Sequence, residues 1–236
     1  MGRYPRLFSP FFRAMVASAE ESRDAPAILA RLARWLETSA RLRRRVNTAL
    51  LYPAILLNLL ALMLVYLGAY VGPLALPRLQ AYPWVAGGAG VALLLGVNAM
   101  SLAGWMPGYG ALRRLAEQAG WAQAVGALLA AGRDPVSAQE AALAVVSDSG
   151  VRHRLQQALD LCRRGEGFSR ALQGLEPELI WYAEAGEQKE DLPSFLFEAA
   201  RVLEERVDHG CRRLVRLAGP VGLALAGALI LVSLAS

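Results

Sequence analysis

The acidic residues Glu20 and Glu187 recur in the same local context and are the strongest candidates for a site. Each stands just before the expected start of a long helix and is followed four residues later by Asp24 or Asp191. A carboxylate there ordinarily stabilises the positive end of the helix dipole, by about 0.3–1 kcal/mol. The alternative is contact with a partner or a bound cation at a domain interface, and the sequence leaves both open.

The other reactive side chains lack partners at catalytic or metal-binding spacing. The cysteines form no CxxC pair and the histidines do not cluster, so we expect no metal site. The chain contains no G-x4-GK-[ST] motif, so we expect no nucleotide hydrolysis. The residues considered are His153, His209, Cys162, Cys211, Ser169 and Ser194. We therefore predict a protein that is not an enzyme and needs no cofactor.

Three long uncharged stretches dominate the rest of the sequence, in which 55% of the residues are hydrophobic and the mean hydropathy is +0.32. A bilayer core of about 30 Å needs about 20 apolar residues in a helix. We expect membrane helices at residues 50–72, 82–105 and 215–236. The polar segments 1–49 and 106–214 then lie outside the bilayer.

Arginines before the first and third stretches set the expected orientation. They are Arg41, Arg43, Arg44 and Arg45 before the first stretch, and Arg212 and Arg213 before the third. By the positive-inside rule the N-terminus and residues 106–214 are cytoplasmic, and the C-terminus lies outside. These arginines also suit anionic lipid, at about 1 kcal/mol each, or an acidic partner. Their position does not indicate nucleic-acid binding.

The polar segments show the periodicity of helices and no long alternation typical of strands. A helix over residues 112–131 is followed by Gly132, and Asp134 with Pro135 predicts the start of the next, through about Val146. Further helices are expected at residues 151–164, 168–172 and 178–185, and a last one begins near Asp191 and can continue into the third span. The fold class is all-α.

The sequence contains an internal duplication at a shift of 167 residues. The pattern E-x3-D-x-P-x2-L-x3-AR-x-LE occurs in both copies without a gap, and the same shift aligns Pro53 with Pro220. The repeated unit is a cytoplasmic helix that leads into a membrane helix. Because proline bends a helix, we hypothesise that Pro53 and Pro220 are joints that transmit motion between the cytoplasmic segments and the spans.

These repeated residues resemble the F-protein family of type II secretion systems, which includes the platform protein of type IV pili. The family's motif, M-[VI]-x2-GE-x-[ST]-G-x-L, is similar to residues 15–23 and to the segment from Ala185 to Leu192. Residues 49–53 (ALLYP), 128–135 (LLAAGRDP) and 165–172 (GEGFSRAL) resemble further family elements. This chain departs from the motif at Ala19, which replaces the first glycine, and at Arg23 and Glu190, which replace the second.

The resemblance implies three transmembrane helices, a cytoplasmic six-helix-type bundle at residues 106–214, and a partial copy of it at residues 1–49. The family's earlier helices of the first domain have no counterpart before Tyr4. It also implies a non-enzymatic platform in the bacterial inner membrane. Expected partners are a hexameric secretion or pilus ATPase, pilin or pseudopilin subunits, other inner-membrane assembly proteins, the lipid bilayer and further copies of the chain.

An alternative from another class is a small membrane transporter or channel subunit. The uncharged cores of the predicted spans contain Asn58 and Asn98 but no charged residue. Transport pathways usually place such a residue within the membrane, so this alternative has less support than the platform.

Overall fold

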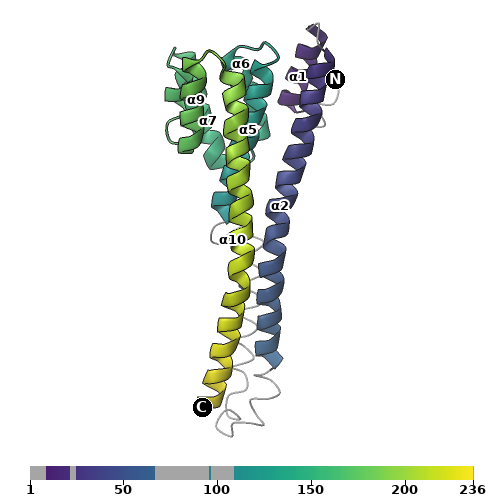
Figure 1. Ribbon diagram of the computed structural model, residues 1–236, viewed down its shortest axis with the longest axis vertical. Coiled ribbons are helices and arrows are strands. Elements are labelled where there is room, and N and C mark those ends of the chain that lie inside the picture. The colour runs from purple at the N-terminus through teal and green to yellow at the C-terminus, as the bar shows by residue number, and fades with distance from the viewer. Residues whose placement is uncertain (1–8, 22–24, 67–95, 97–108, 236) are drawn as a thin grey trace. The chain divides into compact units, whose positions relative to one another are not determined.

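The structure, a computed structural model, describes residues 9–21, 25–66, 96 and 109–235, which form helices joined by short turns (Figure 1). No strand occurs in this part of the chain, which confirms the predicted all-α class there. The helices are α1 (Pro10–Glu21), α2 (Ala25–Tyr66), α5 (Tyr109–Leu129), α6 (Pro135–Ala142), the 3₁₀ turn η3 (Leu143–Val145), α7 (Ser149–Arg163), α8 (Phe168–Ala171), α9 (Pro177–Gln188) and α10 (Leu192–Ala235).

The chain divides into two compact units. The first comprises Met1–Arg44 and Ala111–Asp208, and the second comprises Arg45–Gly110 and His209–Ser236. The two longest helices, α2 with 42 residues and α10 with 44, each begin in the first unit and end in the second.

The membrane spans remain predictions. Among the helices of the described residues, none has the length and apolar character needed to cross a membrane. The span predicted at residues 82–105 lies outside the described residues, apart from Gly96. The first and third predicted spans coincide in part with the ends of α2 and α10, where most side chains lie outside the described set.

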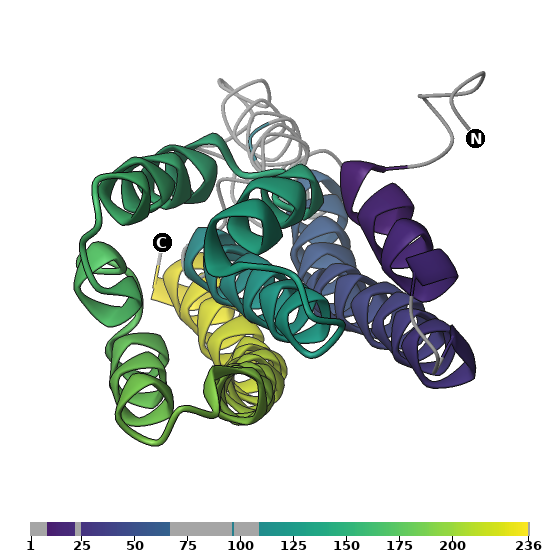
Figure 2. The ribbon, with the colours of Figure 1, turned by 90° about the horizontal axis from the view of Figure 1, so that it is seen from above.

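The core of the first unit surrounds α5. Trp121 of α5 is fully buried, and its ring stacks on that of Phe168 from α8 with 6.3 Å between the centroids. On another side, Phe11 of α1 packs against Trp35 of α2 with 4.5 Å between centroids. Figure 2 shows α7, α8 and α9 following one another along one side of this bundle, with α1 and the start of α2 on the other.

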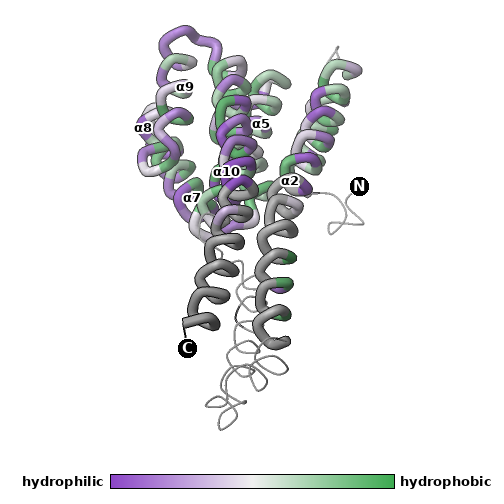
Figure 3. The backbone as a smooth tube through the Cα atoms, turned by 60° about the horizontal axis from the view of Figure 1, so that its bottom comes forward, coloured by the Kyte–Doolittle hydropathy of each residue, from purple (hydrophilic) through white to green (hydrophobic). Residues whose placement is uncertain are grey.

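The amphipathic helices bury one face, as their sequences predict. In α7 the buried residues Val151, Leu155, Ala158 and Leu159 recur at spacings of three and four, which brings them to one face of the helix. Figure 3 shows hydrophilic and hydrophobic residues alternating around the described helices of the first unit. Helix α6, predicted to run through about Val146, ends at Ala142, because the backbone tightens there into the 3₁₀ turn η3.

Glycine and aspartate residues set the helix boundaries in the first unit. Gly132 and Gly165 follow α5 and α7 with φ of 84° and 91°, a left-handed conformation that costs glycine little. Asp134 caps α6 by accepting a hydrogen bond from the Ser137 backbone at 3.0 Å. Asp148 caps α7 in the same way, accepting from the backbone of Gly150 and Val151 at 3.0 Å. The Asp–Pro start of α6 is as predicted.

The helix boundaries repeat with the same shift as the sequence. Helix α1 begins at Pro10 and ends at Glu21, whereas α9 begins at Pro177 and ends at Gln188. Helix α2 begins at Ala25 and α10 begins at Leu192. Each copy is thus a short helix of 12 residues followed by a helix of more than 40.

Candidate functional site

Glu187 lies in the last turn of α9 and binds the start of α8. Its carboxylate accepts hydrogen bonds from the backbone N–H groups of Phe168 at 2.5 Å and Ser169 at 3.1 Å, and from the Ser169 hydroxyl at 2.5 Å. Gly167, the residue before α8, has no side chain with which to cap that helix. Glu187 therefore takes the place of a local N-cap and fastens α9 to α8.

Gly186 allows α9 to approach α10 closely. A Cβ atom added at this position would lie 3.0 Å from the Leu192 Cα and 3.0 Å from the Phe195 Cβ. Real Cβ atoms rarely tolerate contacts this short, and the Leu192 backbone can yield only if the chain shifts. A glycine at this position therefore sets the spacing of the two helices.

The turn after Gly186 contains the only positive φ of a non-glycine residue in the described chain, 56° at Glu190. Asp191 N–H donates to the Gly186 carbonyl at 3.0 Å, and Glu190 N–H donates to the Glu187 carbonyl at 3.3 Å. These are the two hydrogen bonds of a Schellman motif, which favours glycine at the left-handed position. Glu190 occupies the position of the second glycine in the family motif described above.

Asp191 provides the cap that begins α10. Its Oδ1 accepts a hydrogen bond from the Ser194 backbone N–H at 3.3 Å, and Pro193 in the first turn needs no partner for its nitrogen. The segment from Gly186 to Asp191 therefore combines a close helix contact, an anchor to α8, a reverse turn and a helix cap.

The first copy of the motif is described only up to Glu21. Glu20 lies in the last turn of α1 and is exposed, and Asp24 lies outside the described residues. Ala19 replaces the motif's glycine and is buried, with 5% of its surface exposed. Since residues 22–24 lie outside the described residues, the interlocking arrangement is described in the second copy.

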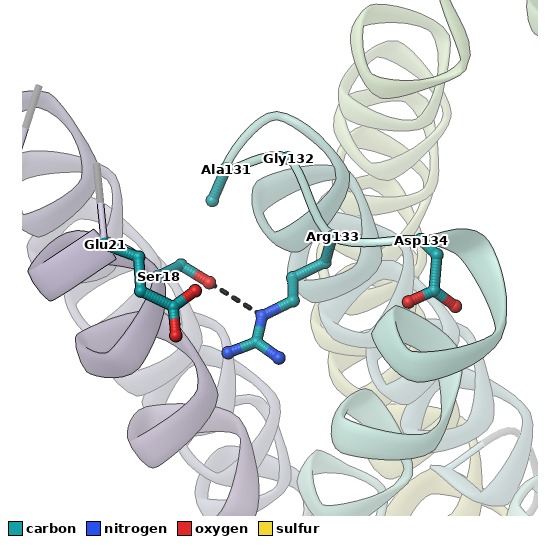
Figure 4. A pocket seen from close by; sticks show the side chains of 6 residues that line it. All are labelled: Ser18, Glu21, Ala131, Gly132, Arg133 and Asp134. Atoms are coloured by element: carbon teal, nitrogen blue, oxygen red, sulfur yellow. Dashed lines mark hydrogen bonds between the residues drawn. The ribbon is translucent and has the colours of Figure 1, made fainter. Parts of the chain in front are cut away.

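The first copy contacts the turn between α5 and α6 through polar groups. Arg133 Nε donates to the Ser18 hydroxyl at 2.9 Å, and Arg31 Nη1 donates to the Ala130 carbonyl at 3.0 Å. Beside these contacts lies an open hollow of about 290 Å³. Figure 4 shows the Glu21 carboxylate of α1 and the Arg133 guanidinium pointing toward the same space. Sequence reasoning missed this contact, because Ser18 and Arg133 lie 115 residues apart.

The juxtamembrane candidates are only partly described. Arg41 and Arg44 on α2 are exposed, as are Arg212 and Arg213 on α10, whereas the side chains of Arg43 and Arg45 lie outside the described residues. Pro220 is exposed within α10, and Pro53 belongs to α2 without a described side chain.

The Cys162 thiol and the His153 imidazole, considered above for chemistry, each take part in a side-chain hydrogen bond. Burial raises the pKa of the Cys162 thiol, which accepts a hydrogen bond from Gln139 Nε2 at 3.2 Å. A thiol with a raised pKa is a poor nucleophile at neutral pH. His153 is exposed and pairs with Gln157 at 3.1 Å. The described residues contain no group of three or more potential metal ligands.

Comparison with known proteins agrees with the motif resemblance. Residues 1–73 and 121–236 match the protein family described as type II secretion system (T2SS), protein F. The type II secretion system protein F of Pseudomonas aeruginosa is 27% identical over 264 residues, covering 97% of this chain and 65% of the relative. That of Vibrio cholerae is 34% identical over 73 residues, covering 31% of this chain and 18% of the relative.

The chain therefore spans less than two thirds of the length of either relative. No solved structure matches it. The family match includes both copies of the repeated unit and more than half of the residues, and the chain belongs to the type II secretion system protein F family.

Proposed function

We propose that this protein is a non-enzymatic inner-membrane platform of a type II secretion or type IV pilus assembly machine. The platform couples movement of a hexameric cytoplasmic ATPase to the assembly of pilin or pseudopilin subunits. Membership of the protein F family supports a place in such a machine. The two protein F relatives are named as components of the type II secretion system.

The observation that carries this proposal is the pair of long helices. Helices α2 and α10 have 42 and 44 residues, which corresponds to about 63 and 66 Å at a rise of about 1.5 Å per residue. Each begins in the first compact unit and continues without a break into the second. A continuous helix resists compression, so it can pass a displacement of the first unit on to the second.

The interlocked motif at the start of α10 supports the same role. Glu187 fastens α9 to α8, and Gly186 holds α9 close against Leu192 of α10. A force applied to the surface of the bundle would reach α10 through these contacts rather than being lost in a flexible turn. We place the ATPase-docking surface on residues 106–214. Separately, the repeat-motif residues Glu20, Asp24, Gly186, Glu187 and Asp191 are candidates for a partner interface.

The membrane arrangement in this proposal comes from the sequence. Three uncharged stretches serve as spans, with the N-terminus in the cytoplasm and the C-terminus outside. The exposed Arg41, Arg44, Arg212 and Arg213 suit the anionic headgroups of the cytoplasmic leaflet. We propose that further copies of the chain and other inner-membrane assembly proteins complete the platform.

Complementation of a deletion strain tests this function. We expect loss of the gene to abolish type II secretion or pilus assembly and the wild-type gene to restore it. A Gly186→Val variant should fail to restore it, because the added side chain separates α9 from α10, whereas Gly120→Ala should restore it. Unchanged secretion and piliation in the deletion strain, with altered uptake of a small solute, would contradict the platform and favour a transporter.

A further inference from the structure

Helix α9 exposes a large aromatic side chain to solvent. Trp181 is 61% exposed. Its ring contacts that of the half-buried Tyr182 edge-on, with 4.8 Å between the centroids. Such a contact favours one orientation of the indole ring, so Trp181 presents a ring that is held on one side and open to solvent on the rest.

The fold does not require an aromatic residue at this position. The shift of 167 residues that relates the two copies aligns Trp181 with Ala14 of α1, and both helices have 12 residues. Ala14 packs, partly buried, against the core of the first unit. The first copy thus forms the same short helix without an exposed ring. An exposed indole that the helix does not need suits contact with another molecule, because tryptophan is enriched among the residues that dominate interfaces.

Carboxylates flank Trp181 on its own helix. Glu178 and Glu184 lie three residues before and after it, which places them one turn away on either side. Glu178 shares a single cationic partner, Arg206 of α10, with Glu176. Glu184 is exposed and forms no ion pair with any residue that the structure describes. The ring is therefore bordered by more negative than positive charge.

The adjoining face of α10, which runs beside α9 (Figure 1), has the same imbalance. Arg201 pairs with both Glu198 and Glu205 at 2.9 Å, and it lies close enough to Tyr182 to interact with it electrostatically. Exposed ion pairs such as these contribute little stability, so the carboxylates can accept other cations. We call Trp181 and the glutamates around it the α9 surface: Trp181, Glu176, Glu178, Glu184, Glu198 and Glu205.

The charge of the α9 surface restricts what it can bind. Its five carboxylates face only two guanidinium groups, those of Arg201 and Arg206. Such an excess repels anionic lipid headgroups and nucleic acid and attracts cations. An exposed indole ring attracts cations as well, through the negative face of its π-system. Both features therefore favour a positively charged occupant.

We propose that the α9 surface binds an arginine-containing basic segment of a partner protein. A guanidinium plane stacks on the Trp181 ring, while Glu178 and Glu184 accept hydrogen bonds from it and from neighbouring basic side chains. Arginine fits better than lysine, because its planar group can stack on a ring and bind a carboxylate at the same time. The inference rests on the proposed function in one respect, that the segment belongs to the cytoplasmic partner that docks on residues 106–214.

Peptide binding to the full-length protein in nanodiscs of zwitterionic lipid tests the proposal. The probes are fluorescently labelled, alanine-based helical peptides that carry arginine, lysine or glutamate at the same positions. Anisotropy titrations should show saturable binding that is tightest for the arginine peptide and absent for the glutamate peptide. Trp181→Leu should weaken binding of the arginine peptide about three- to ten-fold, as expected for the loss of a cation–π contact. Trp181→Phe, which keeps an aromatic ring, should weaken it less.

A matched pair of charge variants tests the carboxylates. Glu184→Gln removes one charge from the α9 surface, and Glu166→Gln removes one from the loop before α8, where Glu166 is equally exposed. Only Glu184→Gln should weaken binding of the arginine peptide. Because the substituted side chains are exposed, every variant should unfold at the temperature of the wild type, which separates lost binding from lost folding.

Three outcomes would overturn the proposal. One is unchanged affinity for the arginine peptide in Trp181→Leu, which would mean that the indole contributes nothing. Another is an equal loss in Glu184→Gln and Glu166→Gln, which would mean a diffuse attraction to the acidic bundle. The third is no saturable binding of the arginine peptide.

None of these measurements involves secretion, so the two proposals can fail separately. Arginine-specific binding by a protein whose deletion leaves secretion and piliation unchanged would refute the platform and keep the α9 surface. A deletion that abolishes secretion, together with any of the three outcomes above, would keep the platform and refute the α9 surface.

Discussion

The Glu187 carboxylate accepts hydrogen bonds from both the backbone N–H and the hydroxyl of Ser169, at 3.1 and 2.5 Å. The two residues are 18 positions apart and lie in α9 and α8. The side chain of Ser169 is buried, with 9% exposed. A glutamate that sequence reasoning places before the long helix α10 thus stabilises the start of a different helix.

Replacing Glu187 by alanine should lower stability by about 1 kcal/mol, the usual cost of losing a helix N-cap. The midpoint of thermal unfolding should fall by about 2–4 °C, measured on the full chain in detergent. Glu184→Ala is the matched control, because Glu184 is exposed one turn earlier on α9. Equal shifts in the two variants would show that the contacts to Phe168 and Ser169 contribute no stability.

Replacing Glu190 by glycine should raise stability by about 0.5–1 kcal/mol, because glycine adopts the φ of 56° without the strain caused by a Cβ atom. The reverse change is Gly165→Ala, at a φ of 91° and with no atom within 4 Å of the added Cβ. It should destabilise by a similar amount through backbone strain alone. Both effects are read from thermal unfolding, and a drop for Glu190→Gly would contradict the left-handed turn.

Alanine at Gly186 should lower the stability of the fold, whereas alanine at Gly120 should leave it unchanged or raise it. At Gly186 the new Cβ meets Leu192 and Phe195 at 3.0 Å, so the variant should lose about 1–3 kcal/mol through overpacking. At Gly120 the nearest atom, on Val145, is 4.0 Å away. Alanine there should be neutral or stabilise α5 by up to about 1 kcal/mol through helix propensity. Similar melting points for the two variants would contradict the close approach of α9 and α10.

The cap of α6 should give a stability difference that depends on pH. The hydrogen bond from the Ser137 hydroxyl, with further help from backbone N–H groups, lowers the pKa of Asp134 below its ordinary value of 3.8. The folded state stabilises the ionised form of Asp134. The cap therefore contributes its full stabilisation above the ordinary pKa of the carboxyl group. That stabilisation is lost as the pH falls through the lowered pKa of the folded state. The melting-point difference between wild type and Asp134→Ala should therefore be constant from pH 5 to 8 and shrink below about pH 4. A constant difference down to pH 2 would contradict this role.

Much of the fold follows from the sequence because its signals are local. Gly132 and the Asp134–Pro135 pair mark the end of α5 and the start of α6, and each acts through its own backbone conformation. The early end of α6 was missed, because no glycine or proline marks the 3₁₀ turn from Leu143 to Val145.

The contacts of the candidate site were less predictable, since they join residues far apart in the chain. Glu187 and Asp191 were identified by their repetition, but the repetition does not show that Glu187 reaches α8. Leu29 and Leu196 occupy equivalent positions, yet one is 47% exposed and the other fully buried. Such differences depend on which helix packs against each copy, which the duplicated pattern does not encode.

The proposed joints at Pro53 and Pro220 predict a defect in assembly rather than in folding. Alanine at both positions should leave the protein in the membrane and its cytoplasmic partners bound, but reduce secretion or piliation, because straighter helices transmit the motion differently. Secretion assays and membrane fractionation of the double variant give the two readouts. Full assembly activity in the double variant would refute the role of these prolines.

The most direct test of the platform is affinity purification of the tagged full-length gene product from native membranes, with mass spectrometry of the proteins that accompany it. We predict enrichment of a secretion-type ATPase and of pilin-like proteins, and loss of the ATPase when residues 106–214 are deleted from a variant that still fractionates with the membrane. Recovery of the protein alone, or together with solute-transport subunits, would contradict the platform.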